Sequence, residues 1–159
     1  MPKVLFVLLL SAVAAGNVRV NYDPFSSAIY PYRVMQPSSF RHVVLPDPLG
    51  HNIDYFYPSL GSAVTDVNIY ADGGPLINMT NLLKQSGAYR VRRSGYLKIG
   101  GVRVGLVSGD RRGYPGHWRE ERAEFVAGGR VWHITMSYLL RYQNMRGAML
   151  HMVRSFRLR

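Results

Sequence analysis

The sequence predicts an α+β fold built on a mostly antiparallel sheet, and two features carry this prediction. Two glycine pairs, Gly100-Gly101 and Gly128-Gly129, each lie between segments in which apolar and polar residues alternate. A two-residue hairpin turn requires positive φ at both central positions, which glycine adopts readily. The chain then ends in a segment whose apolar residues recur every three or four positions, as in an amphipathic helix. These residues are Tyr142, Met145, Met149, Met152 and Phe156.

Length and composition favour one globular domain. The chain has 159 residues, of which 47% are hydrophobic, and this is enough to bury a core without covalent staples. Cysteine is absent. A disulfide framework, a thiol nucleophile, a thiolate metal site and a lipid-modified lipoprotein are therefore excluded.

The N-terminus resembles an export signal. A positive charge at Lys3 precedes an apolar stretch of about a dozen residues, too short to span a bilayer, and Ala12-Val13-Ala14 has the small-x-small form of a cleavage site. We therefore expect a signal peptide over 1–15, a secreted or periplasmic protein, an extended lead-in over 16–29 and a single domain over 30–159. The alternative is that residues 4–15 form a buried strand or helix of the domain.

The elements expected before the glycine pairs are shorter. Strands are predicted over 30–35, 54–57 and 64–71, the last with Val67, Ile69 and Ala71 on one face. Ser38 or Ser39 is expected to cap a short helical turn. A helix is expected over 75–87, because Leu76, Met79, Leu82 and Leu83 recur at helical spacing.

The second half of the chain is predicted to form a four-strand meander. Its strands cover 89–99, 102–107, 118–127 and 130–139, with a bend at Gly95 and with Trp132, Ile134, Met136 and Tyr138 on one face. The Met-containing stripe of the terminal helix is expected to complete the core.

No pattern in the sequence predicts catalysis. The five histidines lie on different expected elements without ligand spacing, so neither a metal site nor a cofactor is expected. His133 is interpreted as a partly solvated strand residue, and Glu120, Glu121 and Glu124 as a solvated strand edge. No Gly-x-Ser-x-Gly occurs, and Gly73-Gly74 fits a turn and helix cap better than an anion cradle. We therefore do not expect an enzyme.

Charge is the strongest indication of a binding role. The net charge is +11 and the pI is near 10.3. Such a positive charge raises the rate of encounter with anionic lipid, wall polymer or nucleic acid, and it does not indicate which of these is the partner. The alternative is that genomic base composition has enriched arginine. The candidate basic face comprises Arg90, Arg92, Arg93, Arg103, Arg111 and Arg112, with Tyr89, Tyr96 and Tyr114 flanking them.

The order of these elements resembles the PsbP-like family, also called Mog1/PsbP/DcrB-like. The resemblance rests on five segments in order, which are Tyr32–Phe40, Val67–Tyr70, Ile99–Val102, Arg130–Thr135 and Met152–Arg157. It implies an α/β/α sandwich in which helices enclose a twisted, mostly antiparallel sheet. It also implies an exported, non-catalytic accessory protein.

These observations lead to two functional hypotheses. The first is an extracytoplasmic domain that docks through its basic face onto an anionic envelope component or a partner protein, with nucleic acid not expected as the partner. The alternative is a carrier of a small molecule or lipid, held in a groove between the terminal helix and the sheet. That groove would be lined by Tyr142, Met145, Met149 and Met152.

Overall fold

The structure, a computed structural model, describes residues 19–59, 65–76, 89–111 and 118–159. The predicted signal segment 1–15 and almost all of the predicted helix over 75–87 lie outside the described residues, as do Arg112 and Tyr114.

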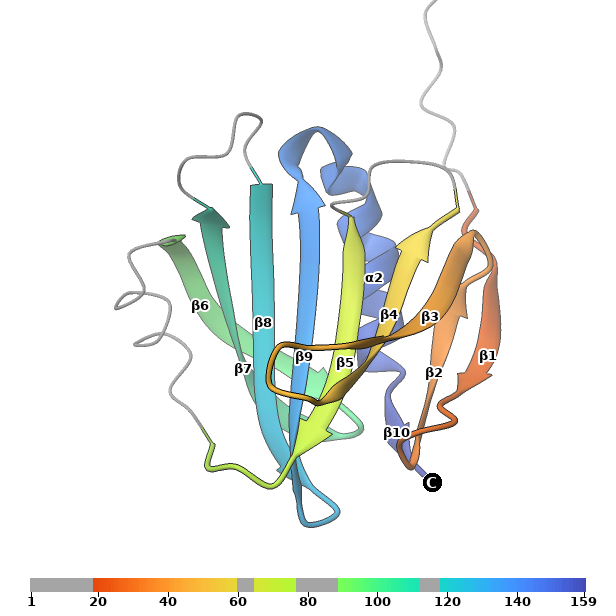
Figure 1. Cartoon of the computed structure of the whole chain (residues 1–159). Coiled ribbons are helices and arrows are strands. Elements are labelled where there is room, and N and C mark those ends of the chain that lie inside the picture. The colour runs from red at the N-terminus through yellow and green to blue at the C-terminus, as the bar shows by residue number, and fades with distance from the viewer. Residues whose placement is uncertain (1–18, 60–64, 77–88, 112–117) are drawn as a thin grey trace, which may run out of the picture.

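Two antiparallel sheets form the architecture (Figure 1). A small sheet has the order β1-β2-β10, and a large one has the order β3-β4-β5-β9-β8-β7-β6. Every pair of neighbouring strands in both sheets is antiparallel. The elements are β1 (Tyr22–Ser26), β2 (Tyr32–Pro37), β3 (Phe40–Pro46), β4 (Asn52–Pro58), β5 (Asp66–Asp72), β6 (Tyr89–Ile99), β7 (Val102–Arg111), β8 (Trp118–Ala127), β9 (Arg130–Leu139), η1 (Leu140–Met145), α2 (Arg146–Arg154) and β10 (Arg157–Leu158).

Glycine pairs make both predicted hairpin turns. Gly100 and Gly101 have φ of 56° and 90°, and Gly128 and Gly129 have φ of 57° and 73°. These values match the turn type that the twist of an antiparallel hairpin favours. Each turn sets the register of the hairpin it closes, so β6 pairs with β7 and β8 with β9 as the sequence predicted. The irregularity in β6 lies between Val91 and Arg93, not at Gly95.

The core lies between the two sheets and α2. One face of the large sheet, here called the helix face, carries Val67, Ile69 and Trp132, and these residues share one hydrophobic cluster with Met149 and Met152 of α2. In Figure 1 α2 lies behind the large sheet, and the chain between β3 and β4 crosses in front of it. We call the front the outer face.

Part of the predicted sandwich is not found. Within the described part of the chain the helices are α2 and the short η1, both following β9, so the prediction of a sheet enclosed by helices is not supported. Ser38 and Ser39 do not cap a helical turn, because they form the tight turn that carries the chain from β2 in the small sheet to β3 in the large one. The predicted lead-in contributes β1, which pairs with β2.

Buried hydrogen bonds join the two sheets. The Asp54 carboxylate, fully buried on β4, accepts hydrogen bonds from the hydroxyls of Ser27 at 2.5 Å and Tyr32 at 2.8 Å. His42 Nε2 lies 2.6 Å from its other oxygen. At the end of α2, the Ser155 hydroxyl accepts a hydrogen bond from the amide of Met35 on β2 at 2.7 Å.

Candidate functional site

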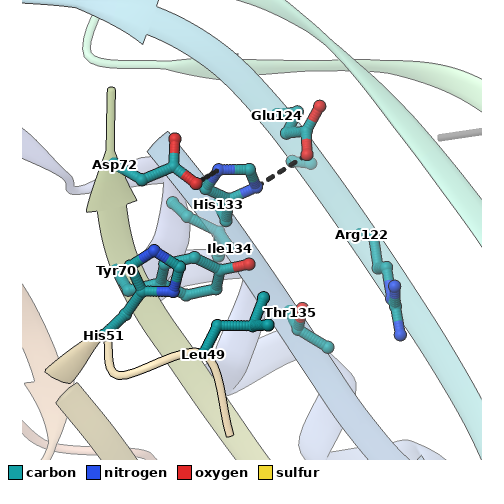
Figure 2. Close-up of a pocket in the computed structure, with 10 residues that line it drawn as sticks. Leu49, His51, Tyr70, Asp72, Arg122, Glu124, His133, Ile134 and Thr135 are labelled. Carbon is teal, nitrogen blue, oxygen red and sulfur yellow. Dashed lines mark hydrogen bonds and ion pairs between the residues drawn. The ribbon is translucent and has the colours of Figure 1, made fainter. Parts of the chain in front are cut away.

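A cavity of about 160 Å³ opens on the outer face, where the β3–β4 loop covers parts of β5, β9 and β8 (Figure 2). Leu49 and His51 come from the loop, Tyr70 from β5, His133 from β9, and Arg122 and Glu124 from β8. The register Glu124↔His133↔Tyr70 runs straight across three strands, so these side chains are neighbours on one face.

Three rings form a stack along one wall of this cavity. Tyr70 and His133 are nearly parallel, at 8°, with their ring centroids 4.4 Å apart. His51 stacks on Tyr70 from the loop, with a centroid distance of 5.7 Å. The loop is also fixed by Asp47, whose carboxylate accepts a hydrogen bond from the amide of His51 at 2.7 Å and lies 2.8 Å from its Nδ1. The stack therefore attaches the β3–β4 loop to the large sheet.

His133 is more enclosed than the sequence predicted. Its exposed fraction is 8%, and it lies between two carboxylates, with Nε2 3.1 Å from Asp72 and Nδ1 2.6 Å from Glu124. Burial opposes ionisation of Asp72, but hydrogen bonds from the Gly74 amide and from His133 outweigh it and lower the pKa of Asp72. Both ring nitrogens of His133 are therefore occupied by contacts within the protein. The arrangement is suited to holding the sheet and the pocket wall in place.

The glutamates of β8 also differ from their prediction as a solvated edge. β8 lies between β7 and β9, and both Glu120 and Glu121 are buried. Glu121 accepts two hydrogen bonds from the Arg146 guanidinium at 2.5 and 2.9 Å, and one from the Tyr138 hydroxyl at 2.6 Å. These bonds raise the pKa of Arg146, and they connect the start of α2 to the large sheet.

Asp66 on β5 is a buried carboxyl group of the outer face that is expected to titrate near neutral pH. Burial raises the pKa of Asp66 to about 7, against opposing hydrogen bonds from Ser137 and Tyr55. Glu120, across β9 from Asp66, adds to the rise. The folded protein therefore holds a proton on Asp66 that the unfolded chain releases at about pH 4.

Asp66→Asn is expected to change how stability depends on pH. The stabilising contribution of protonated Asp66 is complete below about pH 4 and is lost as the pH rises through about 7. Between pH 5 and pH 8 the wild type should lose about 2.5 kcal/mol relative to the variant, whose side chain does not titrate. Urea unfolding at the two pH values measures this. A difference between the two proteins that stays constant from pH 5 to pH 8 would contradict the assignment.

The predicted basic face lies on the β6–β7 hairpin. This hairpin holds six basic residues and a single acidic one, Asp110. We use the name β6–β7 basic surface for its exposed side chains Arg90, Arg92, Tyr96, Lys98 and Arg103. Tyr89 and Arg93 are further strand residues of β6.

The structure divides the predicted residues into two groups at opposite ends of the hairpin. Near one end, Arg92 and Arg119 both contact the Asp110 carboxylate, and Arg111 lies over the Trp118 ring at 4.7 Å. Burial opposes ionisation of Asp110, but the two arginines lower its pKa. Nearer the Gly100-Gly101 turn, about 25 Å along β7 from Arg111, the Arg103 guanidinium lies 3.8 Å from the centroid of the Tyr96 ring, which is 70% exposed.

Lys98 belongs to this second group, and the sequence analysis missed it. It lies directly opposite Arg103 in the hairpin. The Gly100-Gly101 turn, once recognised, sets this register, so the pair could have been predicted by counting back from the turn. Within the described residues, neither Lys98 nor Arg103 forms an ion pair.

The residues predicted to line a groove between the terminal helix and the sheet differ in their burial. Met149 and Met152 are fully buried and belong to the hydrophobic core, whereas Tyr142 and Met145 in η1 are half-buried. Neither Met149 nor Met152 lines the cavity beneath the β3–β4 loop. The stripe therefore packs α2 into the core.

The described residues contain no group of three histidine or acidic side chains placed to hold a metal ion. No helix among them is long and apolar enough to cross a membrane.

Known structures match this chain, although sequences do not. No protein-family model matches, and no curated protein matches significantly. A crystal structure from Bacteroides thetaiotaomicron matches with a TM-score of 0.59 at 12% identity over 89% of this chain, which spans about half (49%) of that protein. Cyanobacterial PsbP (CyanoP) from Synechocystis matches with a TM-score of 0.56 at 11% identity, over 92% of this chain and 98% of its own.

A third structure, LpqN from Mycobacterium tuberculosis, is described as involved in cell envelope biogenesis. It matches with a TM-score of 0.46 at 13% identity, over 88% of this chain and 91% of its own, and this similarity is too weak to support an inference. CyanoP matches nearly from end to end, and the identities are far below those that indicate shared function. The chain has a PsbP-like fold.

Proposed function

We propose that this chain is a non-catalytic accessory domain that works outside the cytoplasm and docks through the β6–β7 basic surface onto an anionic partner. One observation carries the docking proposal. Lys98 and Arg103 are both exposed and directly opposite each other, and like charges in such a cross-strand pair destabilise a sheet. A bound anion would relieve this repulsion.

The exposed ring of Tyr96 supports the same site. Arg103 lies over this ring, which holds the guanidinium in place without neutralising its charge. Arginine presents several donors in one plane and binds carboxylate or phosphate in a bidentate manner. The group formed by Tyr96, Lys98 and Arg103 therefore offers two positive charges beside a flat apolar surface.

Removing the charged pair should weaken binding to polyanions more than removing two charges elsewhere. Lys98→Gln/Arg103→Gln is expected to elute from a sulfated polysaccharide matrix at clearly lower salt than the wild type. The control Arg41→Gln/Arg141→Gln has the same net charge, and its exposed positions lie on β3 and η1. Elution of both double variants at the same salt would show that net charge alone determines retention, and would contradict the proposal.

The extracytoplasmic location rests on the sequence of residues 1–15. N-terminal sequencing of the protein recovered from the native host should find a chain that begins near residue 16. A mature chain that still begins at Met1 would contradict export by cleavage.

A further inference from the structure

Several turns and the last strand meet at one end of the molecule, which we call the turn end (Figure 1). The β6–β7 turn touches the C-terminal segment, because a Cβ on Gly100 would lie 3.2 Å from the carbonyl oxygen of Phe156. The β8–β9 turn does the same, since a Cβ on Gly128 would lie 3.1 Å from Leu158 Cδ1. The Arg159 guanidinium donates to the carbonyl of Ser27, at the β1–β2 turn, at 2.8 Å.

Exposed apolar side chains gather at the turn end. The described residues include ten large hydrophobic side chains that are exposed, and four of them lie here, namely Ile29, Val102, Val126 and Leu158. Val126 is 57% exposed and Val102 is 50% exposed. Val102 and Leu158 also border a largely apolar cavity of about 210 Å³, whose inner wall is formed by Phe125 and Phe156. Val126 lies on the face of β8 opposite Phe125, so exposed apolar side chains are present on both sides of this end. Exposed apolar groups gathered at one end of a protein mark a site of interaction.

Cations surround these apolar side chains. Lys98, Arg103, Arg130 and Arg157 are all exposed and lie within a few residues of the three turns and β10. The Arg157 guanidinium donates hydrogen bonds to the main-chain carbonyls of Arg154 and Phe156, and these bonds do not neutralise its charge.

The carboxylates near the turn end on β5 and β8 contact a histidine and not the cations of the turn end. Asp72 and Glu124 both contact His133 on the outer face. The turn end therefore carries both exposed apolar groups and positive charges, and among the described residues its four cations form no ion pair.

We infer that the turn end docks on the surface of a lipid bilayer that carries anionic headgroups. This inference rests on the proposed function, because Lys98 and Arg103 belong to both surfaces, and it names the anionic partner. An interface that combines apolar insertion with cation–headgroup attraction binds anionic membranes, and each part contributes separately. A soluble polyanion would engage the cations and make no use of Val102, Val126 or Leu158.

The apolar and charged contributions can be separated by variants of the whole chain. Val102→Ser/Val126→Ser should weaken co-sedimentation with vesicles of phosphatidylcholine and phosphatidylglycerol by about tenfold, because burying the exposed parts of two valines in a membrane contributes about that much. Its retention on the sulfated matrix should equal that of the wild type. The control Val44→Ser/Leu45→Ser removes two exposed apolar side chains from β3 and should bind vesicles as the wild type does.

Any one of four results would overturn the inference that the turn end docks on an anionic bilayer. The first is a wild type that binds the sulfated matrix but not the vesicles, which leaves the proposed function standing. The second is unchanged vesicle binding by Val102→Ser/Val126→Ser. The third is equal binding of the wild type to vesicles of pure phosphatidylcholine, which would remove the role of charge. The fourth is binding to neither probe, which would overturn the proposed function as well.

Discussion

Asp54→Ala is expected to lower the free energy of unfolding by about 3–5 kcal/mol, because it removes the shared acceptor of a buried polar cluster. Asp54 is fully buried, and its loss would leave the hydroxyls of Ser27 and Tyr32 without their acceptor inside the protein. His42 would lose its carboxylate at the same time. The two sheets would also lose a polar connection, since Ser27 and Tyr32 lie at the small sheet and Asp54 in the large one.

Urea unfolding followed by far-ultraviolet circular dichroism measures this effect. Asp54→Asn keeps the size and one acceptor oxygen, so it should lose less, about 1–2 kcal/mol. The exposed Asp23→Ala on β1 serves as the matched control and should change stability by less than about 0.5 kcal/mol. If Asp54→Ala were no less stable than this control, the polar cluster would not hold the sheets together.

Trp132→Ala should produce a loss of similar size, about 3–5 kcal/mol, by leaving a cavity at the centre of the core. Trp132 is fully buried, and its ring makes edge contacts with Tyr30, Tyr32 and Phe156. Its indole N–H also donates to the Ala127 carbonyl at 3.0 Å. These contacts join β9 to β2 and to the segment after α2, so their loss should affect the whole domain.

The same unfolding measurement tests this prediction. Trp132→Phe retains an aromatic ring while losing the indole hydrogen bond, and we expect a smaller loss of about 1–2 kcal/mol. Val126→Ala, at an exposed position on the neighbouring strand, should be nearly neutral. A Trp132→Ala protein within about 1 kcal/mol of the wild type would show that the aromatic cluster does not stabilise the domain.

Local patterns predicted the parts of the fold that local physics determines. The glycine pairs set two hairpins and their registers, and the alternation of Trp132, Ile134 and Met136 marked the buried face of β9. The spacing of Met149 and Met152 marked the buried side of α2. In each case the residues concerned are close in sequence, so one turn or one helical repeat decides which side chains share a face.

Contacts between distant segments were not predictable in this way. No local signal indicates that β5 pairs with β9, or that β10 adds to β2. The stack of His51, Tyr70 and His133 needs the β5–β9 pairing and the β3–β4 loop together, so it escaped the sequence analysis. Glu121 looked solvated because it is charged, but its partner Arg146 lies 25 residues later in the chain.

The basic site was predictable in part. Tyr96 and Arg103 meet because the Gly100-Gly101 turn places their strands side by side, and the same register identifies Lys98. Arg92, which was predicted in the same group, contacts Asp110 farther along the hairpin. Lys98 and Arg103, near the turn, form no ion pair among the described residues, whereas Arg92, farther along the strand, contacts a carboxylate of the fold.

The proposed function depends most on docking by the charges of the β6–β7 basic surface. Its most direct test is the affinity of the whole chain for a soluble sulfated polysaccharide, measured by calorimetry across a series of salt concentrations. We predict that the affinity of the wild type falls steeply as salt rises, and that Lys98→Gln/Arg103→Gln binds more weakly with a shallower dependence on salt. The same salt dependence in both proteins, or binding by the wild type that salt does not change, would contradict the account.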